Sequence, residues 1–264
     1  MAKRAVCVGI NDYPGVKADL KGCVNDAKAW SALLLEHYGF SSPDVKVLLD
    51  AQATKANVMA GIKWMFAGAA AGDTLVFTNS SHGTYLVDTS GDEEYDQALC
   101  PFDCDKHLIV DDELRELFGG LPKGVSLSVI ADCCHSGTVT RAAAAATSDD
   151  RRARFLDPSL IGRAVLKEPA LAAPSARSKY PESKMKETLL SGCTSTEFSY
   201  DAQIDGQYHG AMSCFALKAI RSANYAITWE KLHARIGSAL DAAEYPQHPQ
   251  LEGAATNKKK RIFT

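Results

Sequence analysis

The chain has 264 residues, of which 46% are hydrophobic and 23% are charged. This composition is typical of a globular protein, and the length suffices for one domain with a well-filled core. The formal net charge of −3 argues against general nucleic-acid binding, which needs a net basic surface, so we expect no nucleic-acid partner.

The N-terminal stretch MAKRAVCVGIND has a basic start and only a short apolar run before Asn11. That run is too short for the core of a signal peptide or for a membrane span. Eight cysteines without a secretion signal are typical of reduced thiols rather than of disulfides. We therefore expect a cytoplasmic protein that does not associate with a membrane.

Short apolar runs alternate with longer amphipathic stretches along the chain. The runs predict five strands, at 4–10, 45–50, 74–83, 125–134 and 188–194. The amphipathic stretches predict helices at 25–38, at 55–68 after a cap at Thr54, at 211–222 and at 228–243. Strands separated by helices indicate right-handed βαβ units. The predicted fold class is therefore α/β, with a mostly parallel central sheet and helices on both faces.

Residues 129–141, VIADCCHSGTVTR, place two adjacent cysteines at the end of the fourth predicted strand. Because side chains alternate along a strand, Asp132 and Cys134 should point to one side and Cys133 to the other. Thiolate chemistry also needs a base or a positive neighbour that lowers the thiol pKa. His82 ends the third predicted strand, and loops that follow parallel strands meet at one edge of the sheet. We therefore predict that His82 lies near Cys134 and acts as the base for its thiol.

The two motifs NSSHG (79–83) and DCCHSG (132–137) resemble the paired histidine and cysteine motifs of the metacaspases. The histidine precedes Cys134 by 52 positions, close to the spacing in caspases. Further segments resemble metacaspase segments in the expected order: LKGCVNDA (20–27), GDEEYDQALCPFD (91–103), IVDDEL (109–114), LLSGCTSTEFSYDA (189–202), HGAMSCFAL (209–217) and PQLEG (249–253). The resemblance covers nearly the whole chain except 141–187, and it points to prokaryotic or type I-like metacaspases.

This resemblance implies a single caspase-like peptidase domain over 1–264, folded as a three-layer sandwich. Its parts would be a large-subunit-like part at 1–140, a mobile linker and processing segment at 141–187, and a small-subunit-like part at 188–264. It implies a cysteine endopeptidase in which Cys134 is the nucleophile and His82 the general base and acid. Gly83 would offer its backbone N–H, with that of Cys134, to the oxyanion of an acyl-enzyme reaction.

The resemblance also implies a specificity pocket lined by Cys23, Asp26, Ser80 and Asp132. Two carboxylates in one pocket favour a cationic side chain, and arginine can pair with them bidentately. We therefore predict cleavage after Arg or Lys, and partners that are protein or peptide substrates with Arg or Lys before the scissile bond. The family resemblance further implies a monomer.

A calcium site is the one metal centre that the resemblance implies. In metacaspases the aspartates that match Asp96, Asp111 and Asp112 belong to it, and carboxylate oxygens suit Ca²⁺. A further aspartate is expected seven residues after the catalytic cysteine, where this chain has Arg141. A guanidinium removes a ligand and adds repulsion. We therefore expect no required cofactor, and the sequence leaves a calcium dependence open.

The segment 141–187 lies where caspase-like enzymes join their large and small parts. It offers basic residues that we expect to be exposed: Arg151, Arg152, Arg154, Arg163, Arg177 and Lys179. We predict a zymogen that is processed within this segment, by itself or by an activating protease. The alternative is a catalytically silent caspase-like module used for binding or scaffolding. A ligase on the same acyl-enzyme is a third reading that the sequence does not separate from hydrolysis.

Overall fold

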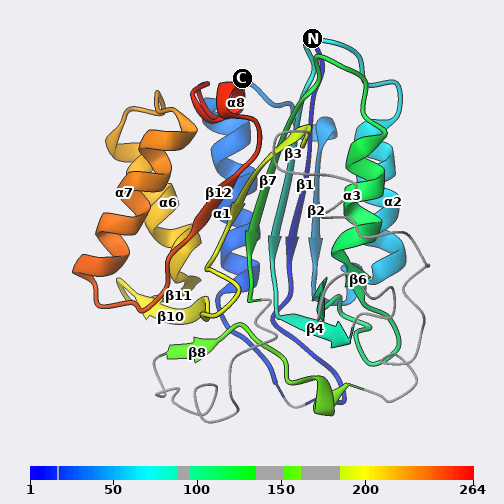
Figure 1. Ribbon diagram of the computed structural model, residues 1–264, viewed down its shortest axis with the longest axis vertical. Coiled ribbons are helices and arrows are strands. Elements are labelled where there is room, and N and C mark those ends of the chain that lie inside the picture. The colour runs from blue at the N-terminus through cyan, green and yellow to red at the C-terminus, as the bar shows by residue number, and fades with distance from the viewer. Residues whose placement is uncertain (17, 88–94, 135–150, 162–184) are drawn as a thin grey trace.

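The computed structural model describes residues 1–16, 18–87, 95–134, 151–161 and 185–264 (Figure 1). Its centre is a six-stranded sheet in the order β12-β9-β7-β3-β1-β2. The strands are β1 (Lys3–Gly9), β2 (Val45–Leu49), β3 (Thr74–Ser80), β7 (Ser126–Asp132), β9 (Glu187–Ser191) and β12 (Gln250–Glu252). All neighbours pair in parallel except β12, which is antiparallel to β9. The five predicted strands are confirmed with small shifts of their ends, whereas β12 is too short to show a pattern.

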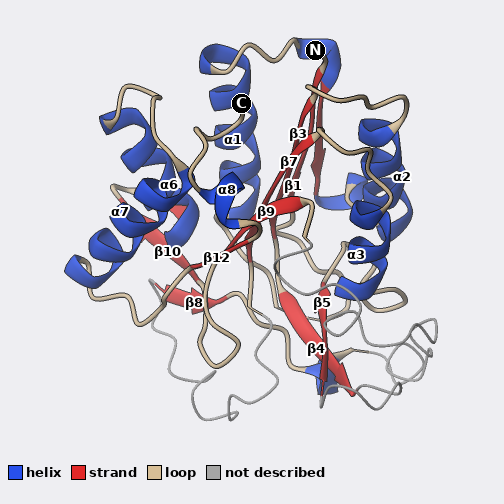
Figure 2. Cartoon of the chain, turned by 45° about the horizontal axis from the view of Figure 1, so that its top comes forward, coloured by secondary structure: helices blue, strands red, loops and turns tan. Residues whose placement is uncertain are grey.

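Helices cover both faces of this sheet, so the predicted three layers are confirmed (Figures 1 and 2). One face carries α1 (Cys23–His37), α6 (Ala211–Ser222) and α7 (Trp229–Ala242), and the other carries α2 (Lys55–Phe66) and α3 (Asp111–Gly119). The short helix α8 (Ala255–Lys258) lies near the C-terminus. The predicted cap is present, since the Thr54 hydroxyl accepts the backbone N–H of Asn57. Helix α3 lies between the third and fourth predicted strands, where no helix was predicted.

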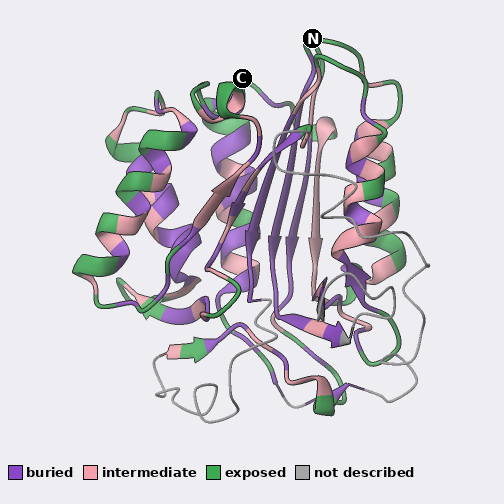
Figure 3. Cartoon of the chain, in the orientation of Figure 1, coloured by how far each residue is buried: buried purple, intermediate pink, exposed green. Residues whose placement is uncertain are grey.

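The hydrophobic core lies on both sides of the sheet, and the central strands are buried along their length (Figure 3). Side chains alternate along β1: Val6 and Val8 pack toward α2, whereas Ala5 and Cys7 pack toward α1. Strand β3 is buried at every position. A parallel strand covered on both faces reads as a continuous apolar run, which is why the sequence shows these strands clearly.

Two small sheets lie at the carboxyl ends of the parallel strands (Figure 1). One contains β4 (Gly83–Val87), β5 (Tyr95–Leu99) and β6 (Ile109–Val110). The other contains β8 (Arg151–Ala153), β10 (Tyr200–Ile204) and β11 (Gln207–Gly210). In the part of the chain that the structure describes, no helix is both long enough and apolar enough to cross a bilayer.

Candidate active site

The predicted histidine and cysteine leave the central sheet side by side. The register of β3 and β7 pairs Ser80 with Asp132, and His82 and Cys134 each follow two residues later. Cys133 packs in the same core cluster as other β7 side chains on the α2 side, as the alternation predicted. Cys134 lies beyond the end of the strand, in a separate small cluster with Ala153, Cys193 and Phe198.

His82 is buried, and its two ring nitrogens have different surroundings. Nε2 lies 2.6 Å from the carbonyl oxygen of Ala18, to which it can only donate. Nδ1 is buried and has no hydrogen-bond partner among the described residues. Burial lowers the pKa of the imidazole to about 4, although the bond to Ala18 acts in the opposite direction. The ring is therefore neutral near pH 7, with a free lone pair on Nδ1, which is the state that a general base requires.

The Cys134 thiol is held by the backbone of Ser199. Its Sγ accepts the Ser199 N–H at 2.7 Å and lies 3.3 Å from the carbonyl oxygen of the same residue. Burial raises the pKa of the thiol well above its ordinary value, and the contact with Cys193 raises it further. The resting pair is therefore a neutral thiol and a neutral imidazole.

The backbone of Arg154 is bonded to Cys134 and to Gly83, the residue after His82. Its carbonyl oxygen accepts the backbone N–H of Gly83 at 3.0 Å and the backbone N–H of Cys134 at 3.2 Å. Its own N–H donates to the carbonyl oxygen of Ser199 at 2.8 Å. Two backbone donors on one carbonyl oxygen are the arrangement of an oxyanion hole. The two donors belong to the residues that the sequence singled out for this role.

The side chain of Arg154 lies in a pocket of three carboxylates and is fully buried. Its Nη2 lies 2.7 Å from Asp26 Oδ2 and 3.0 Å from Asp201 Oδ1. Its Nη1 lies 3.5 Å from Asp132 Oδ2 and donates to the Asp132 carbonyl oxygen at 3.1 Å. Gly210 forms part of the wall, and a Cβ there would overlap with the guanidinium and with the Asp132 carboxylate. The pocket is therefore shaped for a guanidinium.

Other groups hold two of these carboxylates, Asp26 and Asp132, in place. Asp26 accepts the Gly210 N–H at 3.0 Å and lies 2.9 Å from His209 Nδ1. Asp132 accepts the Ser199 hydroxyl and, at 2.8 Å, the Ser213 N–H at the start of α6. Burial raises the pKa of Asp26, while Arg154 and His209 oppose that shift. A cation is needed to keep this pocket charge-compensated, because buried carboxylates without a partner are costly.

The structure brings together Asp26 and Asp132, the two predicted pocket carboxylates, through Arg154. Cys23 begins α1, is buried and interacts electrostatically with the guanidinium, while Ser80 is the last residue of β3 and pairs in register with Asp132. The expectation that Arg154 is exposed is wrong. Residues 151–153 form strand β8, which pairs with β10, and the guanidinium of Arg154 then enters the pocket. The composition of this segment predicted an exposed linker instead. Arg141, Arg163, Arg177 and Lys179 lie outside the described residues.

Sequence reasoning missed two residues of the site, Asp201 and Ser199. Both stand in the segment SYDA, which resembles a metacaspase segment but was given no role. Asp201 also accepts the backbone N–H groups of Lys21 and Gly22, at 2.8 and 3.0 Å. The signal was an acidic residue in the small-subunit-like part, and the pairing of β10 with both β8 and β11 brings it to the pocket.

The three aspartates of the expected calcium site do not form a metal-binding group. Asp111 Oδ2 is paired with Arg115 Nη2 at 3.5 Å, Asp112 follows it in the first turn of α3, and Asp96 is in β5. Within the described residues, no cluster of three or more His, Cys, Asp or Glu side chains is arranged to hold a metal ion. In the part of the chain that the structure describes, these aspartates are therefore not assembled as a Ca²⁺ site, and the mechanism below involves no calcium.

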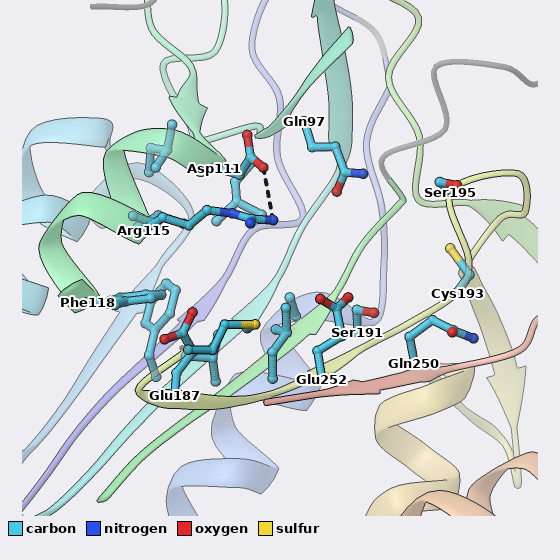
Figure 4. Close-up of a pocket in the computed structure, with 18 of the residues that line it drawn as sticks. Gln97, Asp111, Arg115, Phe118, Glu187, Ser191, Cys193, Ser195, Gln250 and Glu252 are labelled. Carbon is cyan, nitrogen blue, oxygen red and sulfur yellow. Dashed lines mark ion pairs between the residues drawn. The ribbon is translucent and has the colours of Figure 1, made fainter. Parts of the chain in front are cut away.

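A separate cavity of about 270 Å³ lies on the α3 side of the sheet (Figure 4). Its wall combines apolar side chains with Asp111, Arg115, Glu187 and Glu252. His82, Gly83 and Arg154 do not line it, so this cavity is not the cleft that holds Arg154. Cys193 lines the cavity and also touches Cys134, so it lies between the two places.

Comparison with known proteins agrees with this geometry. A family model described as the metacaspase peptidase C14 domain matches residues 3–142. Metacaspase-1A of Aspergillus fumigatus is 31% identical over an alignment of 299 positions, which covers 94% of this chain and 68% of that protein. Metacaspase-4 of Arabidopsis thaliana is 41% identical over 145 residues, which cover 52% of this chain and only 34% of that protein.

Solved structures show the same fold. A protein of Geobacter sulfurreducens superimposes with a TM-score of 0.77 at 25% identity, covering 100% of this chain and 99% of its own. Caspase-1 of Spodoptera frugiperda superimposes with a TM-score of 0.56 at 12% identity, covering 95% of this chain and 86% of its own, and so shows a caspase-like fold. The family model and the identity to Metacaspase-1A over nearly the whole chain establish that this chain belongs to the metacaspase family of cysteine peptidases.

Proposed function

We propose that this chain is a cysteine endopeptidase that cleaves after Arg or Lys through Cys134 and His82. The observation that carries the proposal is the position of Arg154. Its carbonyl oxygen accepts the backbone N–H groups of Gly83 and Cys134, while its guanidinium pairs with buried carboxylates. A peptide bond held in this way is presented to the nucleophile as a substrate would be.

The neutral thiol and the neutral imidazole define the proton transfers. As Cys134 Sγ attacks the carbonyl carbon of Arg154, its proton passes to His82 Nδ1. The carbonyl oxygen becomes an oxyanion that the N–H groups of Gly83 and Cys134 stabilise. The bond from Arg154 to the nitrogen of Phe155 breaks, and His82 returns the proton to that amine. Water then hydrolyses the thioester, with His82 again as the base.

The specificity follows from the charge of the pocket. Once Arg154 leaves, three buried carboxylates remain, and a substrate Arg or Lys restores the balance. An arginine fork pairs with Asp26, Asp132 and Asp201 together, while a lysine ammonium is a single point charge. We therefore expect both residues to be accepted, with Arg preferred. An aspartate side chain would add a fourth negative charge and is expected to be rejected.

We also propose that the chain is made as a zymogen whose first substrate is its own Arg154–Phe155 bond. Residues on both sides of that bond are held by backbone pairing. On the N-terminal side of the bond, strand β8 pairs with β10. On its C-terminal side, the Leu156 N–H donates to the Gly83 carbonyl oxygen at 2.9 Å. While this segment occupies the cleft, other substrates are excluded. Cleavage by the chain itself or by an activating protease would relieve that block.

The setting that we propose is a monomer in the cytoplasm that acts on proteins or peptides. The state of the cysteines supports a reducing compartment, because all eight are buried and none of them forms a disulfide.

The experiment that tests the proposal is hydrolysis of fluorogenic peptides that end in Arg, Lys or Asp. Wild type is compared with Cys134→Ala and with the matched variant Cys133→Ala, whose side chain packs in the core. We expect cleavage after Arg and Lys that is lost in Cys134→Ala and kept in Cys133→Ala. No cleavage by wild type before or after treatment with a trypsin-like protease would overturn the proposal in favour of a silent module.

A further inference from the structure

A second arginine of the segment that occupies the cleft, Arg151, lies against the C-terminal end of helix α7. Arg151 precedes the Arg154–Phe155 bond as the fourth residue, and β8 pairs it with Ala202 of β10. Its guanidinium carbon lies 4.1 Å from the centre of the Tyr245 ring. Its Nη1 donates to the Glu244 carbonyl oxygen at 2.9 Å, and its Nη2 donates to the Ala243 carbonyl oxygen at 3.3 Å. The planar, charged face of the guanidinium therefore contacts the ring, while its two terminal nitrogens bond to the carbonyl oxygens.

The local backbone explains why two carbonyl oxygens face this cation. The Tyr245 N–H donates to the Leu240 carbonyl oxygen and the Glu244 N–H to that of Asp241, while Glu244 has a φ of 56°. This is a Schellman turn, which satisfies the carbonyls of the last helical turn but leaves those of the following residues to accept other donors. They also lie at the negative end of the helix dipole, where a cation is favoured.

The Tyr245 ring is held by neighbouring aromatic rings as well as by Arg151. It is 7% exposed and packs against Tyr200 and Phe215, with ring centres 6.2 and 6.0 Å away. An aromatic face that is already ordered binds a guanidinium without an added entropic cost. Arg152, by contrast, is exposed, and its Nη1 donates to the Asp19 carbonyl oxygen at 2.5 Å.

We infer that the turn Ala243–Glu244–Tyr245 is a second cation-binding subsite, which takes an arginine at the fourth position before the cleaved bond. The preferred substrates of the protease are then peptides of the form Arg-x-x-Arg, in which both arginines are bound. This inference rests on the proposed function, because it concerns the same cleft and the same scissile bond.

The test compares two fluorogenic peptides, Arg-Arg-Ala-Arg and Gln-Arg-Ala-Arg, which differ only in the charged group at the fourth position. The full chain is assayed after its processing is complete. We expect kcat/KM to be about tenfold higher for the first peptide, the size of a partly desolvated cation–π contact with hydrogen bonds. The peptide Arg-Gln-Ala-Arg should lose less, because Arg152 is exposed.

Tyr245→Leu locates the subsite. It keeps an apolar side chain and removes the ring face, so the tenfold ratio between the first two peptides should fall toward one. The matched control is Tyr225→Leu, at another tyrosine that follows a helix, which stacks on His37 and should leave the ratio intact. Equal kcat/KM for the two peptides in wild type would overturn this inference but not the proposed function. No cleavage after Arg in any peptide would instead overturn the proposed function.

Discussion

Asp201 Oδ1 lies 3.0 Å from Arg154 Nη2; Asp201 is in β10, and Arg154 directly follows β8, the strand that pairs with β10. The same carboxylate accepts the N–H groups of Lys21 and Gly22, just before α1. Asp201 therefore connects the strand that binds the substrate segment to the helix that supplies Asp26. It is the third carboxylate of the pocket, and the family resemblance did not assign it.

Asp201→Asn should lower kcat/KM for peptides that end in Arg by about tenfold to a hundredfold. The amide keeps the size and one acceptor but loses the charge that pairs with the guanidinium, and charge-assisted bonds are worth about 1.5 to 3 kcal/mol. The control is Asp205→Asn, whose exposed carboxylate pairs with Lys218 away from the pocket. Equal losses in both variants would mean that the effect is not specific to the pocket.

Self-processing should yield fragments 1–154 and 155–264, which intact-mass spectrometry can identify. Cys134→Ala should stay whole, and added wild-type enzyme should cut it slowly because its segment already fills its own cleft. Fully active enzyme that remains one uncut chain would contradict the zymogen proposal. Cleavage at another basic residue would contradict only the choice of bond.

Arg154→Gln should destabilise the uncut chain by about 3 to 5 kcal/mol, because it leaves Asp26, Asp132 and Asp201 buried without their cation. Chemical denaturation of this variant in the Cys134→Ala background, where no cleavage occurs, measures the difference. Arg152→Gln is the control, since that side chain is exposed and should change the free energy of unfolding by less than about 0.5 kcal/mol. A loss as small in Arg154→Gln would show that the pocket does not need its cation for folding.

The burial of His82 predicts a pH dependence of stability. Its pKa falls from 6.5 when unfolded to about 4 when folded. Between these values the unfolded state binds a proton that the native state does not. The contribution to stability is therefore complete above pH 6.5 and is lost as the pH falls toward 4, by on the order of 3 kcal/mol.

Urea denaturation of wild type and His82→Asn across pH 4 to 7, both in the Cys134→Ala background, measures this contribution. As the pH falls, wild type should lose more unfolding free energy than His82→Asn, because only wild type has the buried imidazole. Asp26 and Glu187, whose pKa values burial raises, contribute equally to both proteins and cancel. A difference that is constant across this range would mean that His82 titrates normally in the folded chain.

Removal of calcium should leave peptide hydrolysis unchanged. Asp111 is paired with Arg115, and Arg141 stands where the family has a further aspartate, so we expect the described carboxylates not to supply the ligands that Ca²⁺ needs. Activity is measured in excess chelator and again after calcium is restored. A large loss in chelator that calcium reverses would show that Asp96, Asp111 and Asp112 bind the ion after all.

The sequence by itself determined the central fold, and it predicted which residues react. Parallel strands buried on both faces appear as apolar runs such as 74–80, and helices as amphipathic stretches, so the layers could be derived from local patterns. The motifs around His82 and Cys134, together with further motifs in the expected order, indicated the family. Both kinds of information lie in short stretches of the chain, so they can be recognised without the folded structure.

Only the tertiary structure decided what fills the cleft. Asp26, Asp132, Arg154 and Asp201 are far apart in sequence, and the pairing of β8 with β10 brings them within hydrogen-bond distance. Composition predicted an exposed linker around Arg154, since a stretch rich in Ala, Ser and Arg lacks the apolar pattern of a buried strand. Its burial depends on charge compensation by three distant carboxylates. A contact of that kind leaves no periodic signal in the sequence, and only the folded chain reveals it.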